Sequence, residues 1–295
     1  MMKFYKLLFL LFVSFNIFAV SVDTGHAKVS LVKYNFSENG VEHNLIGIKM
    51  DMQKNWHTYW KNPGDSGGPI KVKWSHEENL VISDIFWPTP SLIPYDPLMT
   101  YGYKDFVIFP FKLENSGNSN APITANIDFL ICDDICVPEK AYIETTIDEI
   151  VADINLQQWF AEVPTQTLPA KVSLDDEYIE IRFSNNNLLG SAIFFINDAD
   201  IVEHASEQVL IKEENNWLLK IKKLQNIKQL NNISGVLAFD NGDAFIIDAE
   251  IETTSSSSSN INFIQAIIFA FVGGLILNLM PCLFPIISLK VLSFV

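Results

Sequence analysis

A series of short apolar segments that alternate with polar residues along residues 28–150 constrains the fold most strongly. Period-two alternation is typical of β-strands with one buried face. Turn-forming clusters such as NPGDSGGP and ENSGNSNAP separate the segments. Strands joined in this way predict an immunoglobulin-like β-sandwich. The seven candidate strands are AKVSLVKYN, HNLIGIKMDM, PIKVKWS, LVISDIFWP, DFVIFPFKLE, ITANIDFLI and AYIETTI.

A second β-rich region, residues 151–252, begins with NLQQWFAEVP, which is predicted to be a connecting helix. Its candidate strands are KVSLDDEYIEIRFS, SAIFFIND, NWLLKIKKL and GVLAFDNGDAFIIDAEIE. Asn241 and Gly242 lie between two alternating runs and predict a hairpin with a type I′ turn, in which both residues have positive φ. We expect a second, smaller β-sandwich, so the predicted fold class is all-β with two sandwiches.

The N-terminal residues 1–27 resemble a secretory signal peptide. Lys3 and Lys6 precede a short apolar core, and Ala19 and Ala27 are candidate cleavage positions. The alternative is a membrane anchor, but the apolar run is short for a span of about 20 residues. Cleavage and export would place the mature domains outside the cytoplasm, where disulfides persist.

The C-terminal part of the chain is predicted to enter a membrane. A serine-rich linker, residues 253–261, leads into residues 262–295, and no charged residue occurs from Ile261 to Leu289. This apolar stretch is long enough for a transmembrane helix surrounded by lipid. Because the sequence ends inside an apolar run, we expect a fragment of a longer membrane protein. The formal net charge of −15 argues against a nucleic-acid partner.

Two cysteines, Cys132 and Cys136, lie in the segment FLICDDICVPEK. Four residues of extended strand span about 13 Å, whereas a disulfide needs Cα atoms within about 7 Å. The chain must therefore turn between them; Asp133 and Asp134 favour a turn, and Pro138 prevents a helix from continuing. We predict a pair at a loop tip between two strands, where a partner thiolate can reach a disulfide.

Three roles are open for this pair. As a structural crosslink it closes a small loop, which contributes about 2 kcal/mol against about 3 for a 15-residue loop. Zinc commonly takes four ligands, and none of the five histidines is near the pair in sequence. A copper site with His57 and Met52 is a further alternative, and His57 could instead activate a thiol or simply end a strand. We interpret the pair as redox-active, with a crosslink and a metal site as alternatives.

The third cysteine, Cys282, lies between Pro281 and Pro285 in MPCLFP, at the end of the predicted transmembrane helix. Proline breaks or kinks a helix, and irregular backbone in a membrane is tolerated where it is buried in protein or lines a cavity. We expect this membrane kink to face the interior of a helix bundle. The alternative is a buried cysteine beside a packing kink.

These segments resemble a known family. GGLILNLMPCLFPIISLKVLSF resembles the opening of the membrane domain of the thiol:disulfide interchange protein DsbD family. WHTYWKNPGDSGGP, YGYKDFVIFP and CDDICVPE resemble the periplasmic N-terminal region of that family, particularly its ScsB-like branch. The resemblance covers most of the mature chain and is loose over residues 160–250.

The resemblance implies a protein-disulfide reductase of the bacterial inner membrane, with its N-terminal domains in the periplasm and no cofactor. Family members pass reducing equivalents from cytoplasmic thioredoxin through a thioredoxin-like domain to the immunoglobulin-like domain. Cys132 and Cys136 match the pair that reduces clients, and Cys282 matches the first cysteine of the membrane pair. Clients in the family include disulfide isomerases and proteins of cytochrome c maturation or copper tolerance. The pair is more widely spaced in DsbD itself, and a second membrane cysteine and a thioredoxin-like domain are not in this sequence.

The family shields its N-terminal pair with a cap loop. By order along the chain, PYDPLMTYGYKD occupies that place, and Met99, Tyr101 and Tyr103 are the candidate lid residues. The alternative is that these side chains pack the edge of the sandwich. For the whole chain, the alternative function is a non-enzymatic periplasmic module that binds a metal or a partner and has a structural disulfide.

Overall fold

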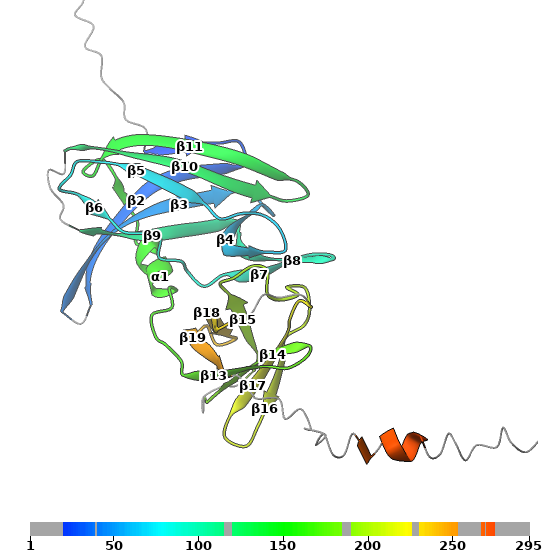
Figure 1. The fold of residues 1–295 in the computed structure, drawn as a ribbon. Helices are drawn as coiled ribbons and strands as arrows, with labels where there is room; N and C mark the ends of the chain where they lie inside the picture. The colour runs from blue at the N-terminus through cyan, green and yellow to red at the C-terminus, as the bar shows by residue number, and fades with distance from the viewer. Residues whose placement is uncertain are drawn as a thin grey trace, which may run out of the picture. The chain divides into compact units, whose positions relative to one another are not determined.

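The structure is a computed structural model that describes residues 20–38, 40–114, 120–184, 190–225, 230–252, 267–268 and 270–274. The chain divides into two compact units, residues 1–252 and residues 253–295. In the described part of the first unit, strands predominate and α1 (Asn155–Ala161) is the one helix, so the predicted all-β class is confirmed (Figure 1). The predicted serine-rich linker, Cys282 and its flanking prolines Pro281 and Pro285 lie outside the described residues.

The first domain consists of two sheets around one core. One sheet has the order β1 (Ser21–Asp23), β2 (Ala27–Glu38), β3 (Val41–Met52), β9 (Phe106–Glu114), β6 (Val81–Ile82), and β12 (Val151–Ala152) pairs with β2. The other has the order β11 (Cys136–Thr146), β10 (Pro122–Cys132), β4 (His57–Gly64), β8 (Leu98–Lys104), β7 (Ser91–Tyr95), and β5 (Lys71–Ser75) pairs with β10. Inward side chains such as Val29, Ile48, Phe109, Ile127 and Ile143 are fully buried between the sheets.

The period-two pattern located most of these strands. Six of the seven candidate segments contain a strand of five residues or more, and LVISDIFWP contains only the short β6. The pattern missed β1, β4, β7, β8 and β12. Strands β4, β7 and β8 contain proline or glycine, residues that are depleted in strands and resemble turn signals.

The connecting helix is confirmed as α1 (Asn155–Ala161). Its Leu156 is fully buried against Val32, Leu45 and Ile108 of the first sheet. Gly47 of β3 permits this close approach, since an added Cβ would lie 2.7 Å from Ile108 and 2.8 Å from Leu156. A side chain at this position would push the helix away from the sheet.

The second domain is one curled sheet of seven strands. Its order is β15 (Ala192–Ile196), β18 (Asn232–Phe239), β19 (Ala244–Glu252), β13 (Ala170–Leu174), β14 (Tyr178–Phe183), β17 (Trp217–Lys222), β16 (Val209–Lys212). We expected a sandwich of two sheets, but a short parallel pairing of Val172 with Ile251 joins the two halves. The sheet curls around a core that includes Phe194, Leu219 and Leu237.

The predicted hairpin at Asn241 and Gly242 is confirmed, but its predicted turn type is wrong. Only Gly242 has positive φ, at 89°. The Gly242 N–H donates to the Phe239 carbonyl at 3.0 Å, and the Phe239 N–H donates to the Asp243 carbonyl at 2.9 Å. The loop therefore has three residues with glycine in the left-handed region, which is the next most common hairpin connection after the two-residue turn.

The two β-domains share apolar contacts. Phe195 and Val236 of the second domain belong to the core of the first, and the rings of Trp60 and Phe195 meet edge to face at 6.2 Å. The buried Asn62 side chain donates to the Ile196 carbonyl at 2.8 Å. These contacts place strands β4 and β15 against each other.

The second unit is described only at residues 267–268 and 270–274, which are helical. Within the described residues, no helix is both long enough and apolar enough to cross a bilayer. The transmembrane helix expected within residues 262–295 stays a prediction.

Candidate redox site

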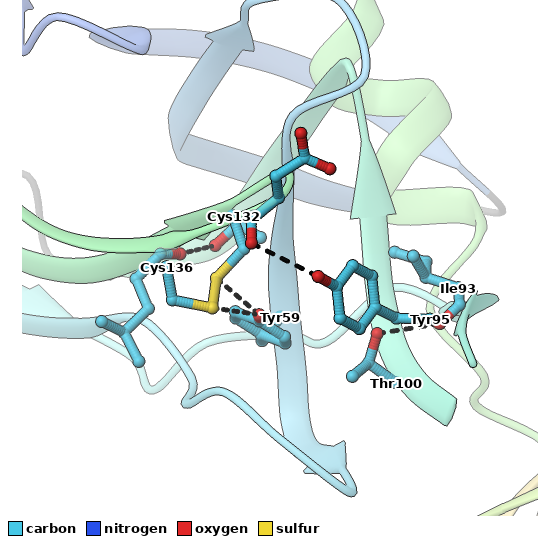
Figure 2. Close-up of a disulfide and its surroundings, with 9 residues drawn as sticks. Tyr59, Ile93, Tyr95, Thr100, Cys132 and Cys136 are labelled. Atoms are coloured by element: carbon cyan, nitrogen blue, oxygen red, sulfur yellow. Dashed lines mark hydrogen bonds between the residues drawn. A yellow bond between two sulfur atoms is a disulfide. The ribbon is translucent and has the colours of Figure 1, made fainter. Parts of the chain in front are cut away.

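The cysteine pair closes the tip of a regular hairpin. Strands β10 and β11 pair in register along their whole length, and the last pair is Cys132 with Cys136. Their Cα atoms are 4.2 Å apart and their sulfur atoms are bonded (Figure 2). The Asp133 N–H donates to the Ile135 carbonyl at 3.2 Å within the loop. The predicted turn between the cysteines, at a loop tip between two strands, is therefore confirmed.

The two cysteines differ in exposure. Cys132 is only 2% exposed, whereas Cys136 is exposed. The neighbouring Ile135 is 67% exposed and gives the hairpin tip an apolar side chain in solvent. A thiolate that arrives from outside therefore meets Cys136 first.

Tyr59 of β4 contacts both sulfur atoms. Its hydroxyl donates to the Cys132 Sγ at 2.7 Å and lies 3.4 Å from the Cys136 Sγ. Figure 2 shows the phenol end directly beside the disulfide. Burial raises the pKa of Tyr59 to about 12, so the hydroxyl keeps its proton at neutral pH and can donate it. A buried hydrogen-bond donor next to the inner sulfur would stabilise negative charge there when the disulfide opens.

A glycine turn fixes the Tyr59 ring. Gly67 has a φ of 99°, and a Cβ added to it would lie 2.2 Å from the ring. Only glycine adopts this φ without strain and leaves space for the ring. The cluster NPGDSGGP, which the sequence identified as a turn, therefore also supports the side chain that contacts the disulfide.

His57, the candidate thiol activator, lies on the strand beside the pair. It is the cross-strand partner of Cys132, and its ring meets the Tyr59 ring at 5.3 Å. Burial lowers the pKa of His57, Lys104 lowers it further, and Asp133 opposes both. With the disulfide closed, these effects favour the neutral imidazole at pH 7.

Each candidate lid residue has a packing or hydrogen-bond partner of its own. Tyr101 is fully buried and contacts Phe195 and His204 of the second domain. Tyr103 is buried and donates to the Pro88 carbonyl at 2.7 Å. The Met99 N–H donates to the side chain of Asp65 at 2.8 Å. The structure thus gives the three predicted lid residues packing contacts, which was the alternative interpretation.

Another residue of the same segment reaches the disulfide loop. Tyr95, at the tip of the β7–β8 hairpin, donates to the Asp134 carbonyl at 3.4 Å and is 51% exposed (Figure 2). Tyr95 belongs to the segment PYDPLMTYGYKD, but the sequence analysis named only Met99, Tyr101 and Tyr103 from it. A tyrosine one residue before the Asp-Pro turn between two alternating runs was the available signal.

A metal site finds no support in the described part of the chain. There, no three His, Cys, Asp or Glu side chains form a group that could hold a metal ion. Met52, proposed as a copper ligand together with His57, is buried at the end of β3.

Comparison with known proteins supports the predicted resemblance. Residues 29–147 match the family described as thiol:disulfide interchange protein DsbD, N-terminal. The fold is similar to the crystal structure of the N-terminal periplasmic domain of ScsB from Proteus mirabilis, with a TM-score of 0.62 and 16% identity over 78% of this chain and 96% of that chain. No curated protein matches. The family match confirms the predicted similarity to the DsbD family, and the ScsB structure shows that the fold is similar.

Proposed function

We propose that this chain is a protein-disulfide reductase that acts outside the cytoplasm, with Cys132 and Cys136 as its catalytic pair. The family match over residues 29–147 supports thiol–disulfide exchange in general. The observation that carries the specific proposal is the asymmetry of the disulfide. It closes a hairpin tip with Cys136 exposed and Cys132 buried under a hydrogen-bond donor.

The first half of the reaction loads the pair with electrons from a thioredoxin-like partner. A partner thiolate attacks the Sγ of Cys136, an intermolecular disulfide forms, and the Cys132–Cys136 bond breaks with its electron pair left on Cys132. The second thiolate of the partner then attacks the partner's own sulfur in the mixed disulfide and releases Cys136 as a thiolate. The partner ends as a disulfide. The two thiolates of this chain take up two protons from water and become thiols.

The second half runs the same steps on a client. Cys136 attacks the client disulfide, and Cys132 then attacks Cys136 in the mixed disulfide and releases the reduced client. When the Cys132–Cys136 bond opens or closes, the charge appears or disappears on the Cys132 Sγ, the atom that the Tyr59 hydroxyl contacts at 2.7 Å. Tyr59 is positioned to stabilise that charge.

The remaining features are proposed from the resemblance. The redox domain would occupy residues 28–150 and the second β-domain residues 151–252, both in the periplasm after removal of the signal peptide. Residues 262–295 would begin a membrane domain in the inner membrane. There Cys282 would receive electrons that originate from cytoplasmic thioredoxin. Clients would be periplasmic disulfide proteins, including those of cytochrome c maturation or copper tolerance.

Single-cysteine variants test the proposal. Reduced Cys132→Ser and Cys136→Ser chains are each mixed with a thioredoxin-like protein whose one remaining cysteine is activated as a thionitrobenzoate disulfide. The linked peptide is identified by mass spectrometry. We expect Cys132→Ser, which keeps the exposed Cys136, to form the mixed disulfide much faster than Cys136→Ser.

Two outcomes would contradict the proposal. Equal rates in the two variants would remove the assignment of Cys136 as the attacking sulfur. No mixed disulfide in either variant, together with an unmodified chain whose disulfide resists the reduced partner, would favour a structural disulfide in a binding module.

A further inference from the structure

Strand β11 begins at the exposed Cys136 and is the last strand of its sheet (Figure 1). Among the described residues, β11 pairs with β10 on one side, and no backbone hydrogen bond joins its other side to a further strand. The turn after β1 contacts the buried side chain of Glu139, whose carboxylate is bonded by Thr24 and His26. The outer side of β11 is therefore an open sheet edge that starts at the redox site.

The pairing at the hairpin tip shows which backbone groups face this edge. The Asp133 N–H donates to the Ile135 carbonyl. Because bonded and non-bonded pairs alternate along antiparallel strands, the next pair, Cys132 with Cys136, is not hydrogen-bonded. Their Cα distance of 4.2 Å agrees, since the spacing is about 4.5 Å in such pairs and about 5.5 Å in bonded ones. The N–H and carbonyl of Cys136 therefore point away from β10, as do those of every second residue along β11.

Pro138, two residues further along β11, supports this assignment. Proline has no N–H, and within a sheet it occurs on edge strands where that position faces solvent. Beyond it, Lys140 and Tyr142 each present an outward donor and an outward acceptor. The side chains of both residues are exposed, so a second chain can reach their backbone.

An antiparallel strand added at this edge would place a cysteine in position for exchange. On this side Cys136 would belong to a hydrogen-bonded pair, in which the Cα atoms lie about 5.5 Å apart. Disulfides most often join Cα atoms about 5.5–6 Å apart, so a cysteine opposite Cys136 could bond to it without backbone movement. Side chains of directly opposite residues share one face of a sheet. The three sulfur atoms would thus form a row that ends at Cys132, and in this row the attacking sulfur is aligned with the bond that breaks.

We propose that a client of the reductase binds β11 as an added antiparallel strand, with its own cysteine opposite Cys136. The client is a protein segment that is extended on the N-terminal side of a disulfide cysteine. Antiparallel pairing places the residue four before that cysteine opposite Lys140 and the residue six before it opposite Tyr142. An acidic residue and an aromatic or β-branched residue suit these two places. The proposal rests on the proposed function of the cysteine pair and adds the form in which a client is recognised.

Backbone-methylated peptides test the added strand. The probe is a short peptide of alternating threonine and valine, with glutamate four residues before a cysteine that is activated as a thionitrobenzoate disulfide. In the reduced Cys132→Ser chain, kept in detergent, the Cys136 thiolate bonds to the peptide sulfur and thionitrobenzoate leaves with the electron pair. N-methylation of the glutamate removes the N–H that would bond to Lys140 and should slow this release roughly two- to twelvefold, the range of one net hydrogen bond. N-methylation of the following residue, whose N–H faces away from β11, should leave the rate unchanged.

A matched pair of chain variants tests the same edge from its other side. Both are made in the Cys132→Ser chain. Lys140→Pro and Lys140→Ala lose the same charge, but only proline removes the outward N–H, as Pro138 already does. Lys140→Pro should react with the peptide roughly two- to twelvefold more slowly than Lys140→Ala. The two variants should react equally fast with dithiodipyridine, a small disulfide that needs no strand contact, which shows that the surroundings of Cys136 are intact.

Hydrogen exchange separates binding at the edge from the redox chemistry. A peptide with serine in place of its cysteine, added in excess to the unmodified oxidised chain, should slow amide exchange at Lys140 and Tyr142. Such protection without thiol–disulfide exchange with any partner would support the edge and contradict the proposed function.

Three results would overturn the proposed edge and leave exchange by Cys136 intact. These are equal rates with the two methylated peptides, no protection of the Lys140 and Tyr142 amides, or a dimeric chain in which these amides are protected before peptide is added. The last result would assign the edge to a second copy of the chain.

Discussion

Replacing Tyr59 by phenylalanine removes a single hydroxyl from beside the disulfide. The hydroxyl lies 2.7 Å from the Cys132 Sγ and 3.4 Å from the Cys136 Sγ, so the closer hydrogen bond is the one to the sulfur that leaves. The phenylalanine ring still fills the space against Gly67. Access to the disulfide is therefore unchanged, and the substitution tests electrostatics alone.

The size of the effect follows from the charge on Cys132. A hydrogen bond to a charged group contributes about 1.5–3 kcal/mol. If about half of the charge has developed in the transition state, the loss is about 0.75–1.5 kcal/mol, which corresponds to a roughly four- to twelvefold slower reaction. Tyr59→Phe should therefore be reduced by dithiothreitol roughly four to twelve times more slowly than the unmodified chain.

Tyr103→Phe is the matched control. It removes another buried phenol hydroxyl, one that donates to the Pro88 carbonyl and does not contact the disulfide. Its reduction rate should equal that of the unmodified chain. A rate for Tyr59→Phe within twofold of the control, or a faster one, would refute the argument that Tyr59 stabilises the leaving thiolate.

Three further predictions follow from the surroundings of the pair. Gly67→Ala should lower the free energy of unfolding by about 1–3 kcal/mol more than Gly40→Ala. Both glycines have positive φ, but only a Cβ at Gly67 would clash with the Tyr59 ring. Equal losses in denaturant titration would contradict the contact between Gly67 and Tyr59. Burial lowers the pKa of His57 in the folded state below its unfolded value of about 6.5. The neutral imidazole therefore contributes stability above about pH 6.5, and this stability is lost as the pH falls through the folded-state pKa. The drop in Tm from pH 8 to pH 5 should thus be smaller in His57→Gln, and an identical drop would count against this. N-terminal sequencing of the exported chain should show cleavage after Ala19. Cleavage after Ala27 would remove β1, which pairs with β2. A mature chain that starts after β1 would contradict this prediction.

The period-two pattern was enough to place the cysteine pair. Strands β10 and β11 alternate over 11 residues each, and the distance limit for a disulfide required the turn between Cys132 and Cys136. Both inferences use only neighbours in the chain. The loop tip could therefore be predicted without the rest of the fold.

The surroundings of the pair could not be predicted in the same way. Tyr59 reaches Cys132 only because β4 pairs with β10, across a sequence separation of 73 residues. The sequence marked Tyr59 merely as one aromatic in WHTYW. The surroundings of Tyr101 could not be predicted for a related reason, because the alternation of β8 turns this residue toward a second domain whose position no local pattern reveals.

The reduction potential of the Cys132–Cys136 pair tests the central claim most directly. The full chain is equilibrated with graded ratios of reduced and oxidised dithiothreitol, and the oxidised fraction of the peptide is measured by mass spectrometry. Structural disulfides of exported proteins typically lie below about −300 mV. We predict a value above about −300 mV and exchange with a reduced thioredoxin-like protein. A value below that limit without such exchange would contradict a redox role for the pair.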